Sequence, residues 1–375
     1  MDSKREQTIN SIYQLSKYYG QFNYYCMEIS YNYDLKNIIN YITNEAKTQE
    51  LNDVVVSNAI WQEVLSEVNI PIDFGSFGCT AFKMKEVKEN ETIYRMGRSY
   101  DFAKDTSCML VYCHPEDKLK SVAYAALDNI QANNPIDHEQ KKCCLASPFI
   151  CLDGMNECGV SIAVLTLDSQ PTYQKEFDKS YITPTLAIRA VLDNAHSAKE
   201  AVNIIHKYNM YATGGRDYHF FITDNTGDTH VVEYDCDSDA IDNFVDLNKV
   251  TSYDHLYNLE AVTNFHIQYF DKVTMTKDNG PYGHGRDRYS KVMDIIKRNN
   301  HNCSSRETWD ALKAVAQIPS TDGEITSNTQ WSIIFNNTLL MSTLALRRDF
   351  TTLFCFDLKT ETNYVPGAIL PDTDI

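Results

Sequence analysis

The chain has 375 residues, a length that suits two or three domains or one large domain with an extension. Its hydrophobic and charged contents, 43% and 23%, are typical of a folded globular protein and exclude a disordered tail. The formal net charge of −17 repels nucleic-acid phosphates and anionic lipids, so the composition argues against binding to nucleic acid or to a membrane surface.

No apolar run is long enough to cross a bilayer, and the first residues, MDSKREQ, lack the hydrophobic core of a secretory signal. We therefore expect a cytoplasmic protein. Its 11 cysteines are odd in number and irregularly spaced, which disfavours a disulfide framework in a reducing compartment. The group Cys143, Cys144, Cys151 and Cys158 lacks the paired Cys-x-x-Cys pattern of a zinc site, and we expect neither a metal nor a cofactor.

The N-terminal part is predicted to be helical. Apolar residues recur at helical spacing over 53–68 and more weakly over 9–15. The sequence PIDFGSFG at 71–78 then ends the helix with a proline and two glycines. We expect this break to separate an N-terminal segment from the main domain.

From residue 79 onward, blocks of strands and helices are predicted to follow one another. Helices are expected at about 185–208 and 286–298, and a hairpin at 218–233. The expected strands are 79–82, 92–96, 107–112, 149–152, 160–165, 331–335, 339–346 and 352–358. This succession favours an α+β layered domain with antiparallel sheets.

Cys79 stands out among the cysteines as a candidate nucleophile. It follows the glycine-containing break and opens a predicted strand, and the sequence GRSYDF at 97–102 lies about one hairpin further on. The returning strand would bring Arg98 and Asp101 beside Cys79. An arginine stabilises a thiolate by its positive charge, and a carboxylate accepts a hydrogen bond from an amine.

A cysteine nucleophile needs a base, and the scattered histidines offer no papain-like or caspase-like pairing. An N-terminal α-amine, with an ordinary pKa of about 7.7–8.0, can act as that base near neutral pH. Cys79 would acquire such an amine if the Gly78–Cys79 bond were cut. Glycine at 78 leaves the carbonyl uncrowded and permits unusual backbone geometry.

These residues, with further motifs in the same order, resemble the N-terminal nucleophile cysteine hydrolases: bile salt hydrolases, penicillin V acylases and isopenicillin N acyltransferase-like enzymes, the choloylglycine hydrolase superfamily. The resemblance covers about 75–360. The motifs are GCTAF at 78–82, GRSYDF at 97–102, DGMNECGV at 153–160, the hairpin from His219 to Glu233, VTN at 262–264, RY at 288–289 and TQWS at 329–332.

The resemblance implies a four-layer αββα sandwich and a role for each matching residue. Cys79 would be the nucleophile and, through its freed amine, the base. Arg98 would lie against the thiolate, and Asp101 would bind the α-amine and steer the substrate. Asn264 and a backbone N–H near Thr166 and Leu167 would stabilise the oxyanion. Arg288 would complete the charged cluster.

Structural interpretations of the same residues stay open at this point. Arg98 and Asp101 are also compatible with an ordinary ion pair, Asn264 with a turn cap, and Arg288 with a solvated helix charge. Asn156 is expected to shape its turn. Three residues of the hairpin are expected to serve its geometry: Asp224, Gly227 and Glu233.

Departures from the bile salt hydrolase pattern favour the acylase and acyltransferase-like branch. In bile salt hydrolases the nucleophilic cysteine directly follows the initiator methionine, whereas 78 residues precede Cys79 in this chain. The segments LTL at 165–167 and TNFH at 263–266 stand where bile salt hydrolases have LNF and TNNP. These departures put bile salts in doubt as the substrate.

We predict a helical pro-segment, 1–78, that is removable by self-cleavage at Gly78–Cys79, and an Ntn-hydrolase domain, 79–375. The expected activity is hydrolysis of linear, non-peptide amide bonds in small N-acyl substrates through a thioester on Cys79. Acyl transfer to an amine as in the isopenicillin N acyltransferase type, bile salt hydrolysis, and a non-catalytic binding role that retains the fold are the alternatives. A homo-oligomer is compatible with the sequence.

Overall fold

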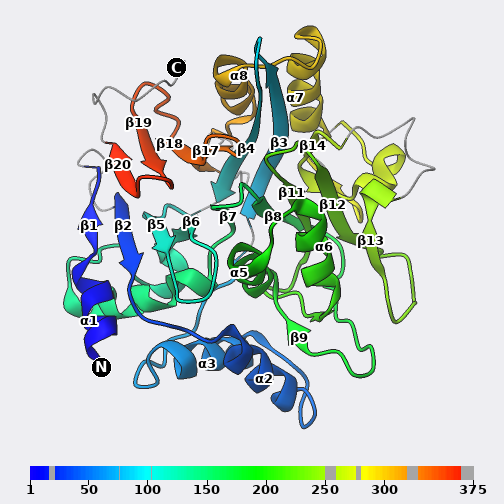
Figure 1. Ribbon diagram of the computed structural model, residues 1–375. Helices are drawn as coiled ribbons and strands as arrows, with labels where there is room; N and C mark the ends of the chain where they lie inside the picture. The colour runs from blue at the N-terminus through cyan, green and yellow to red at the C-terminus, as the bar shows by residue number, and fades with distance from the viewer. Residues whose placement is uncertain are drawn as a thin grey trace.

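The computed structural model describes residues 1–16, 22–75, 77–102, 104–249, 259–275, 280–318 and 328–364. Within these ranges two β-sheets pack face to face, and helices cover their outer faces (Figure 1). The larger sheet has nine strands and the smaller has seven.

The larger sheet has the strand order β1-β2-β5-β6-β7-β8-β11-β12-β13. Its neighbours are antiparallel except for β2 and β5, which run parallel. The strands are β1 (Tyr13–Gln14), β2 (Tyr24–Ile29), β5 (Cys108–Cys113), β6 (Ser121–Ala126), β7 (Asp153–Asn156), β8 (Ser161–Leu167), β11 (Asp217–Thr223), β12 (Thr229–Tyr234) and β13 (Phe244–Asp246).

The smaller sheet has the order β14-β3-β4-β17-β18-β19-β20 and is antiparallel throughout. Its strands are β3 (Phe77–Val87), β4 (Thr92–Phe102), β14 (Ala261–Val262), β17 (Asn328–Asn336), β18 (Met341–Leu346), β19 (Leu353–Asp357) and β20 (Thr362–Tyr364). The long hairpin β3–β4 carries the sequence in which the nucleophile is predicted.

The helices complete the outer layers. Helices α5 (Pro184–Asn194) and α6 (Ala198–His206) contact the larger sheet, and α7 (Arg286–Arg298) and α8 (Ser305–Val315) contact the smaller one. Strand β3 contacts β8 and β11, so the two sheets face each other directly. The predicted α+β class with a four-layer αββα arrangement is therefore confirmed.

Short elements connect these layers. They are α4 (His138–Cys143), the strand pairs β9 (Tyr181–Ile182) with β10 (Asn209–Met210) and β15 (Asn264–Phe265) with β16 (Gly283–His284), and the 3-10 helices η1 (Leu127–Ile130), η2 (Cys144–Phe149), η3 (Leu247–Lys249) and η5 (Ile267–Lys272).

The N-terminal segment is only partly the helical unit that we expected. It contains α1 (Ser3–Asn10), α2 (Leu35–Glu45) and α3 (Asp53–Val64), but β1 and β2 add two strands to the edge of the larger sheet. Strand β2 is rich in aromatic and other apolar residues, which suit a strand. Its parallel partner, β5, lies about 80 residues away along the chain, and local periodicity does not reveal such a pairing.

Other boundaries differ from the expectations. Residues 149–152 end a 3-10 helix and lead into β7 instead of forming a strand. The helix expected over 185–208 is divided, because Ser197 caps a new helix, α6, by accepting a hydrogen bond from the backbone of Glu200. Strand β6 and helix α8 were not predicted.

Candidate active site

Cys79 lies in β3, which pairs with β4 in the smaller sheet. Strand β3 runs without interruption across the Gly78–Cys79 bond, and the Cys79 side chain is fully buried. In the β3–β4 register Cys79 is opposite Tyr100, and Ala81 is opposite Arg98. Because side chains alternate between the two faces of a strand, Cys79 and Arg98 project from the same face.

Arg98 points from that face toward the larger sheet. Its Nε atom is 3.3 Å from Oδ2 of Asp153 in β7, and its Nη2 atom donates to the carbonyl of Val164 in β8 at 3.2 Å. Burial raises the pKa of the Cys79 thiol to about 11, while the nearby Arg98 guanidinium opposes the rise. Burial likewise raises the pKa of Asp153 to about 7 against the influence of Arg98.

Asp101 lies on the other face of the hairpin, opposite Gly78 in the register. Its Oδ1 atom accepts hydrogen bonds from Ser99 at 2.9 Å and from Thr329 at 2.5 Å, and its Oδ2 atom is 3.9 Å from Nη1 of Arg288. The ordinary Arg98–Asp101 ion pair that we considered is therefore replaced by two pairs on opposite faces. Arg98 pairs with Asp153, and Asp101 faces Arg288.

Asn264 connects the two sheets beside the nucleophile. Its Oδ1 atom accepts the backbone N–H of Cys79 at 2.8 Å and Nη2 of Arg288 at 2.7 Å. Its Nδ2 atom donates to the carbonyl of Thr166 at 2.8 Å. Leu167 follows Thr166 at the end of β8, buried like its neighbour. Asn264 thus does more than cap a turn.

Arg288 is a buried residue near the start of α7, not a solvated helix charge. Its Nη1 atom donates to the carbonyl of Cys79 and, at 2.9 Å, to Oγ1 of Thr80. Gly285 precedes the helix with φ +92°, and a Cβ atom there would lie 2.5 Å from Nη2 of Arg288. A side chain at this position would therefore displace the Arg288 guanidinium from its contact with Asn264.

The predicted site residues thus gather around one bond. As expected, the structure brings these residues together around the Gly78–Cys79 bond: Cys79, Arg98, Asp101, Asn264, Arg288 and the end of strand β8 at Thr166–Leu167. Asp153 belongs to the same cluster, although the sequence singled it out only as part of the DGMN motif. Asp153 is the first residue of this motif and of strand β7, and this position was the available sequence signal.

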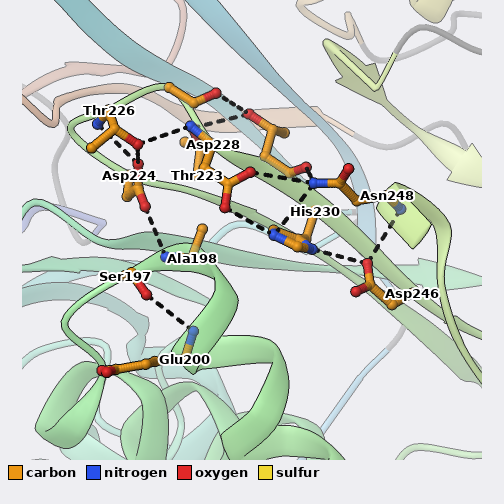
Figure 2. A network of polar contacts seen from close by, with 12 residues as sticks. Ser197, Ala198, Glu200, Thr223, Asp224, Thr226, Asp228, His230, Asp246 and Asn248 are labelled. Carbon is orange, nitrogen blue, oxygen red and sulfur yellow. Dashed lines mark hydrogen bonds and ion pairs between the residues drawn. The ribbon is translucent and has the colours of Figure 1, made fainter.

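The hairpin β11–β12 contains both structural and site-facing residues. Asp224 shapes the turn, as expected: it accepts hydrogen bonds from Thr226 and from the backbone of Ala198 (Figure 2). Gly227 has φ +82°, and a Cβ there would clash with the ring of Tyr94. Glu233 differs, because its carboxylate faces the segment that carries Asn264.

Asn156 serves its own turn, as expected. Its Oδ1 atom accepts the backbone N–H groups of Cys158 and Val160, each at 3.1 Å, and its Nδ2 atom donates to the carbonyl of Ala195 at 2.8 Å. These contacts hold the β7–β8 connection against α5.

The end of the N-terminal segment is buried against the main domain. Phe74 lies five positions before Cys79 and is 4% exposed. It lines a cavity of about 10 Å³ together with Leu152, Val164 and Tyr218. Pro184 and Thr185 of α5 line it as well, so this cavity lies on the face of the larger sheet that α5 covers. It is too small to admit an organic molecule.

A second, open pocket of about 360 Å³ lies at the junction of the N-terminal segment and the main domain. It is lined by the start of α3 at 52–54 and by the loops at 171–173 and 211–215.

Within the described ranges, no helix combines the length and apolarity needed to cross a bilayer. These ranges hold no group of three or more His, Cys, Asp or Glu side chains arranged to bind a metal ion.

Comparison with known proteins gives a consistent assignment. The family model described as linear amide C–N hydrolases, choloylglycine hydrolase family, matches residues 79–289, more than half of the chain. The matched region begins at Cys79. A search of curated protein sequences finds no significant match.

Solved structures with similar folds include those of two enzymes. Two variants of conjugated bile acid hydrolase from Clostridium perfringens each give a TM-score of 0.56, at 15% and 16% identity. The alignments cover 78% and 79% of this chain and 97% and 100% of theirs. Penicillin V acylase from Agrobacterium tumefaciens gives a TM-score of 0.53 at 17% identity, covering 75% of this chain and 86% of that one. At these identities the likeness concerns the fold.

Proposed function

Because the chain belongs to the choloylglycine hydrolase family of linear amide C–N hydrolases, we propose that it is a cysteine amidohydrolase of the N-terminal nucleophile type. Its substrates would be small N-acyl compounds with linear, non-peptide amide bonds. The observation that carries the proposal is the buried cluster in which Asn264 and Arg288 both contact the backbone of Cys79, while Arg98 lies on the side of its thiol.

The first step of the proposal is self-cleavage. The Sγ atom of Cys79 attacks the carbonyl carbon of Gly78, the Gly78–Cys79 C–N bond breaks, and the nitrogen takes up a proton to become an α-amine. The acyl group of Gly78 is then held as a thioester on Sγ. Water hydrolyses this thioester to a carboxylate on Gly78 and a free thiol on Cys79.

In the mature enzyme the α-amine of Cys79 would take the thiol proton as the sulfur attacks the substrate carbonyl. The tetrahedral oxyanion would receive hydrogen bonds from Nδ2 of Asn264 and from a backbone N–H near Thr166 and Leu167. The leaving amine takes a proton, and water then releases the acid from the thioester. Nδ2 of Asn264 donates to Thr166 in the uncut chain, so this donor must be redirected after maturation.

The region 1–78 would remain bound after cleavage as a second polypeptide. Strand β2 pairs with β5 inside the larger sheet, and Oη of Tyr33 donates to Asp193 at 2.8 Å. Oη of Tyr31 donates to the carbonyl of Leu145 at 2.6 Å, and both tyrosines are buried. Cleavage at Gly78–Cys79 leaves all of these contacts intact. The direct effect of cleavage is a free chain end at Gly78, four residues after Phe74.

The proposal is tested with intact-mass measurement followed by an activity screen. We expect the wild-type chain to separate into fragments 1–78 and 79–375, and Cys79→Ala to stay whole. The mature protein is then incubated with a panel of N-acyl amides, and the acyl-enzyme on Cys79 is trapped and located by mass spectrometry. Equal cleavage of Cys79→Ala, or acylation at another residue, would contradict the proposal.

A further inference from the structure

Asn264 lies in a segment with little regular structure of its own. Strand β14 ends at Val262, and β15 contains only Asn264 and Phe265. Each of these strands is two residues long, so the sheet ladders contribute few hydrogen bonds to holding Asn264. Other contacts must fix its position relative to Cys79.

A buried histidine holds this segment just before Asn264. The ring of His219, from β11, lies with Nε2 2.7 Å from the carbonyl oxygen of Thr263 and Nδ1 2.9 Å from Oε1 of Glu233. Both partners are acceptors, so satisfying both requires a proton on each ring nitrogen. Thr263 in turn donates its hydroxyl to the carbonyl of Gly285 at 2.9 Å, next to the helix that carries Arg288.

The same carboxylate holds the segment just after Asn264. Glu233 accepts the backbone N–H of Ile267 at 2.7 Å and that of Gln268 at 3.3 Å. Its Oε2 atom is 3.7 Å from Nδ1 of His266. Although burial opposes ionisation, these histidines lower the pKa of Glu233 to about 2. A buried carboxylate is stable only when it is compensated in this way, and such charge-assisted hydrogen bonds are the stronger ones.

We propose that Glu233 and His219 are positioning residues for the reaction. Together they hold the backbone on both sides of Asn264 and so place its side-chain amide between Cys79 and Thr166. This inference rests on the proposed amidohydrolase function for its kinetic consequence, whereas its geometric consequence can be measured in a protein without activity.

The same hairpin offers a matched control. His230 and Asp246 form another buried histidine–carboxylate pair, with Nδ1 2.9 Å from Oδ1 (Figure 2). His230 lies on β12, the strand that also carries Glu233. Its further contacts are to Asp228 and Asn248 at the outer part of the hairpin, and the segment of Asn264 is not among them. A substitution in either pair removes a buried charge. Of the two pairs, the one formed by His219 and Glu233 contacts the segment that carries the proposed oxyanion donor, Asn264.

The experiment compares Glu233→Gln with Asp246→Asn in the full chain after maturation. We expect Glu233→Gln to lower kcat about 10- to 100-fold with KM within about twofold, because displacing a reacting group by about 1 Å has an effect of this size. We also expect faster hydrogen–deuterium exchange at the amide of Ile267. Asp246→Asn is expected to leave kcat and this exchange within about twofold of wild type.

Each other outcome decides the question. Equal kcat losses in the two variants, or unchanged exchange at Ile267 in Glu233→Gln, would overturn the positioning role. If the wild-type chain hydrolyses no amide, the proposed function fails, and the exchange measurement alone decides on the positioning. If Glu233→Gln does not fold, His219→Gln takes its place, since it keeps one donor for Thr263 but loses the charged pair.

Discussion

The backbone N–H of Cys79 donates a hydrogen bond of 2.8 Å to Oδ1 of Asn264. The proposed oxyanion residue is therefore hydrogen-bonded to the nitrogen of the peptide bond that we expect to be cut. The same amide group donates through Nδ2 to Thr166 on the opposite sheet. Asn264 therefore links the nitrogen that would become the α-amine to the strand end that would complete the oxyanion hole.

Asn264→Asp is expected to keep the contact with the N–H of Cys79 and to lose the amide donor. The carboxylate keeps the shape of the side chain and its acceptor for the N–H of Cys79, but it has no amide donor for an oxyanion. Loss of one such donor typically lowers kcat by about 10²–10³-fold. Steady-state hydrolysis by matured protein measures the effect, and thermal unfolding shows whether the fold is intact. A folded variant with wild-type kcat would remove Asn264 from the mechanism.

Arg98 is expected to set the pH at which self-cleavage proceeds. Burial raises the pKa of the Cys79 thiol to about 11, and Arg98 opposes the rise. Without this cation the thiol pKa rises further, so at a given pH less thiolate is present and cleavage requires more alkaline conditions. Arg98→Gln alone would leave Asp153 buried without its partner, at a cost of about 3–5 kcal/mol. The test therefore uses Arg98→Gln/Asp153→Asn.

Freshly translated chains of the double variant and of wild type are followed by mass spectrometry from pH 6 to pH 10. The expected result is slower appearance of the 79–375 fragment and a rate profile displaced to higher pH. Asp153→Asn alone is the control, since it retains the cation beside the thiol. Because it leaves Arg98 buried without its carboxylate, its thermal unfolding is measured alongside that of the double variant. Superimposable profiles for wild type and the double variant would contradict the role of Arg98.

The residues of the candidate site could be predicted from the sequence more readily than the contacts between them. Arg98 follows Cys79 by one hairpin turn, and strand alternation accounts for their shared face. The Arg98–Asp153 and Arg288–Asp101 pairs depend on how two sheets and a helix pack, which short motifs do not encode. Glu233 was interpreted as a hairpin residue because its partners at 263–268 lie about 30 residues further along the chain. The strand pairing of β2 with β5 was missed for the same reason.

Glu233 also predicts a change of stability in acid. Its pKa is about 2 in the folded protein and 4.5 ordinarily, so the unfolded chain takes up a proton first as the pH falls. The stabilisation is complete above about pH 4.5 and is lost as the pH falls toward 2, by about 3 kcal/mol in total. Urea unfolding of wild type and Glu233→Gln at pH 6 and pH 3 should give a stability difference that shrinks in acid. A difference independent of pH would show that the charge is not responsible.

Retention of the N-terminal region is expected to be visible in solution. After cleavage, size-exclusion chromatography should give one peak that contains both fragments, because β2 remains within the larger sheet and Trp61 remains buried. Denaturant should be needed to separate them. The intact-mass spectrum of the peak identifies its components, and recovery of 79–375 as a folded species without 1–78 would disprove the two-chain enzyme.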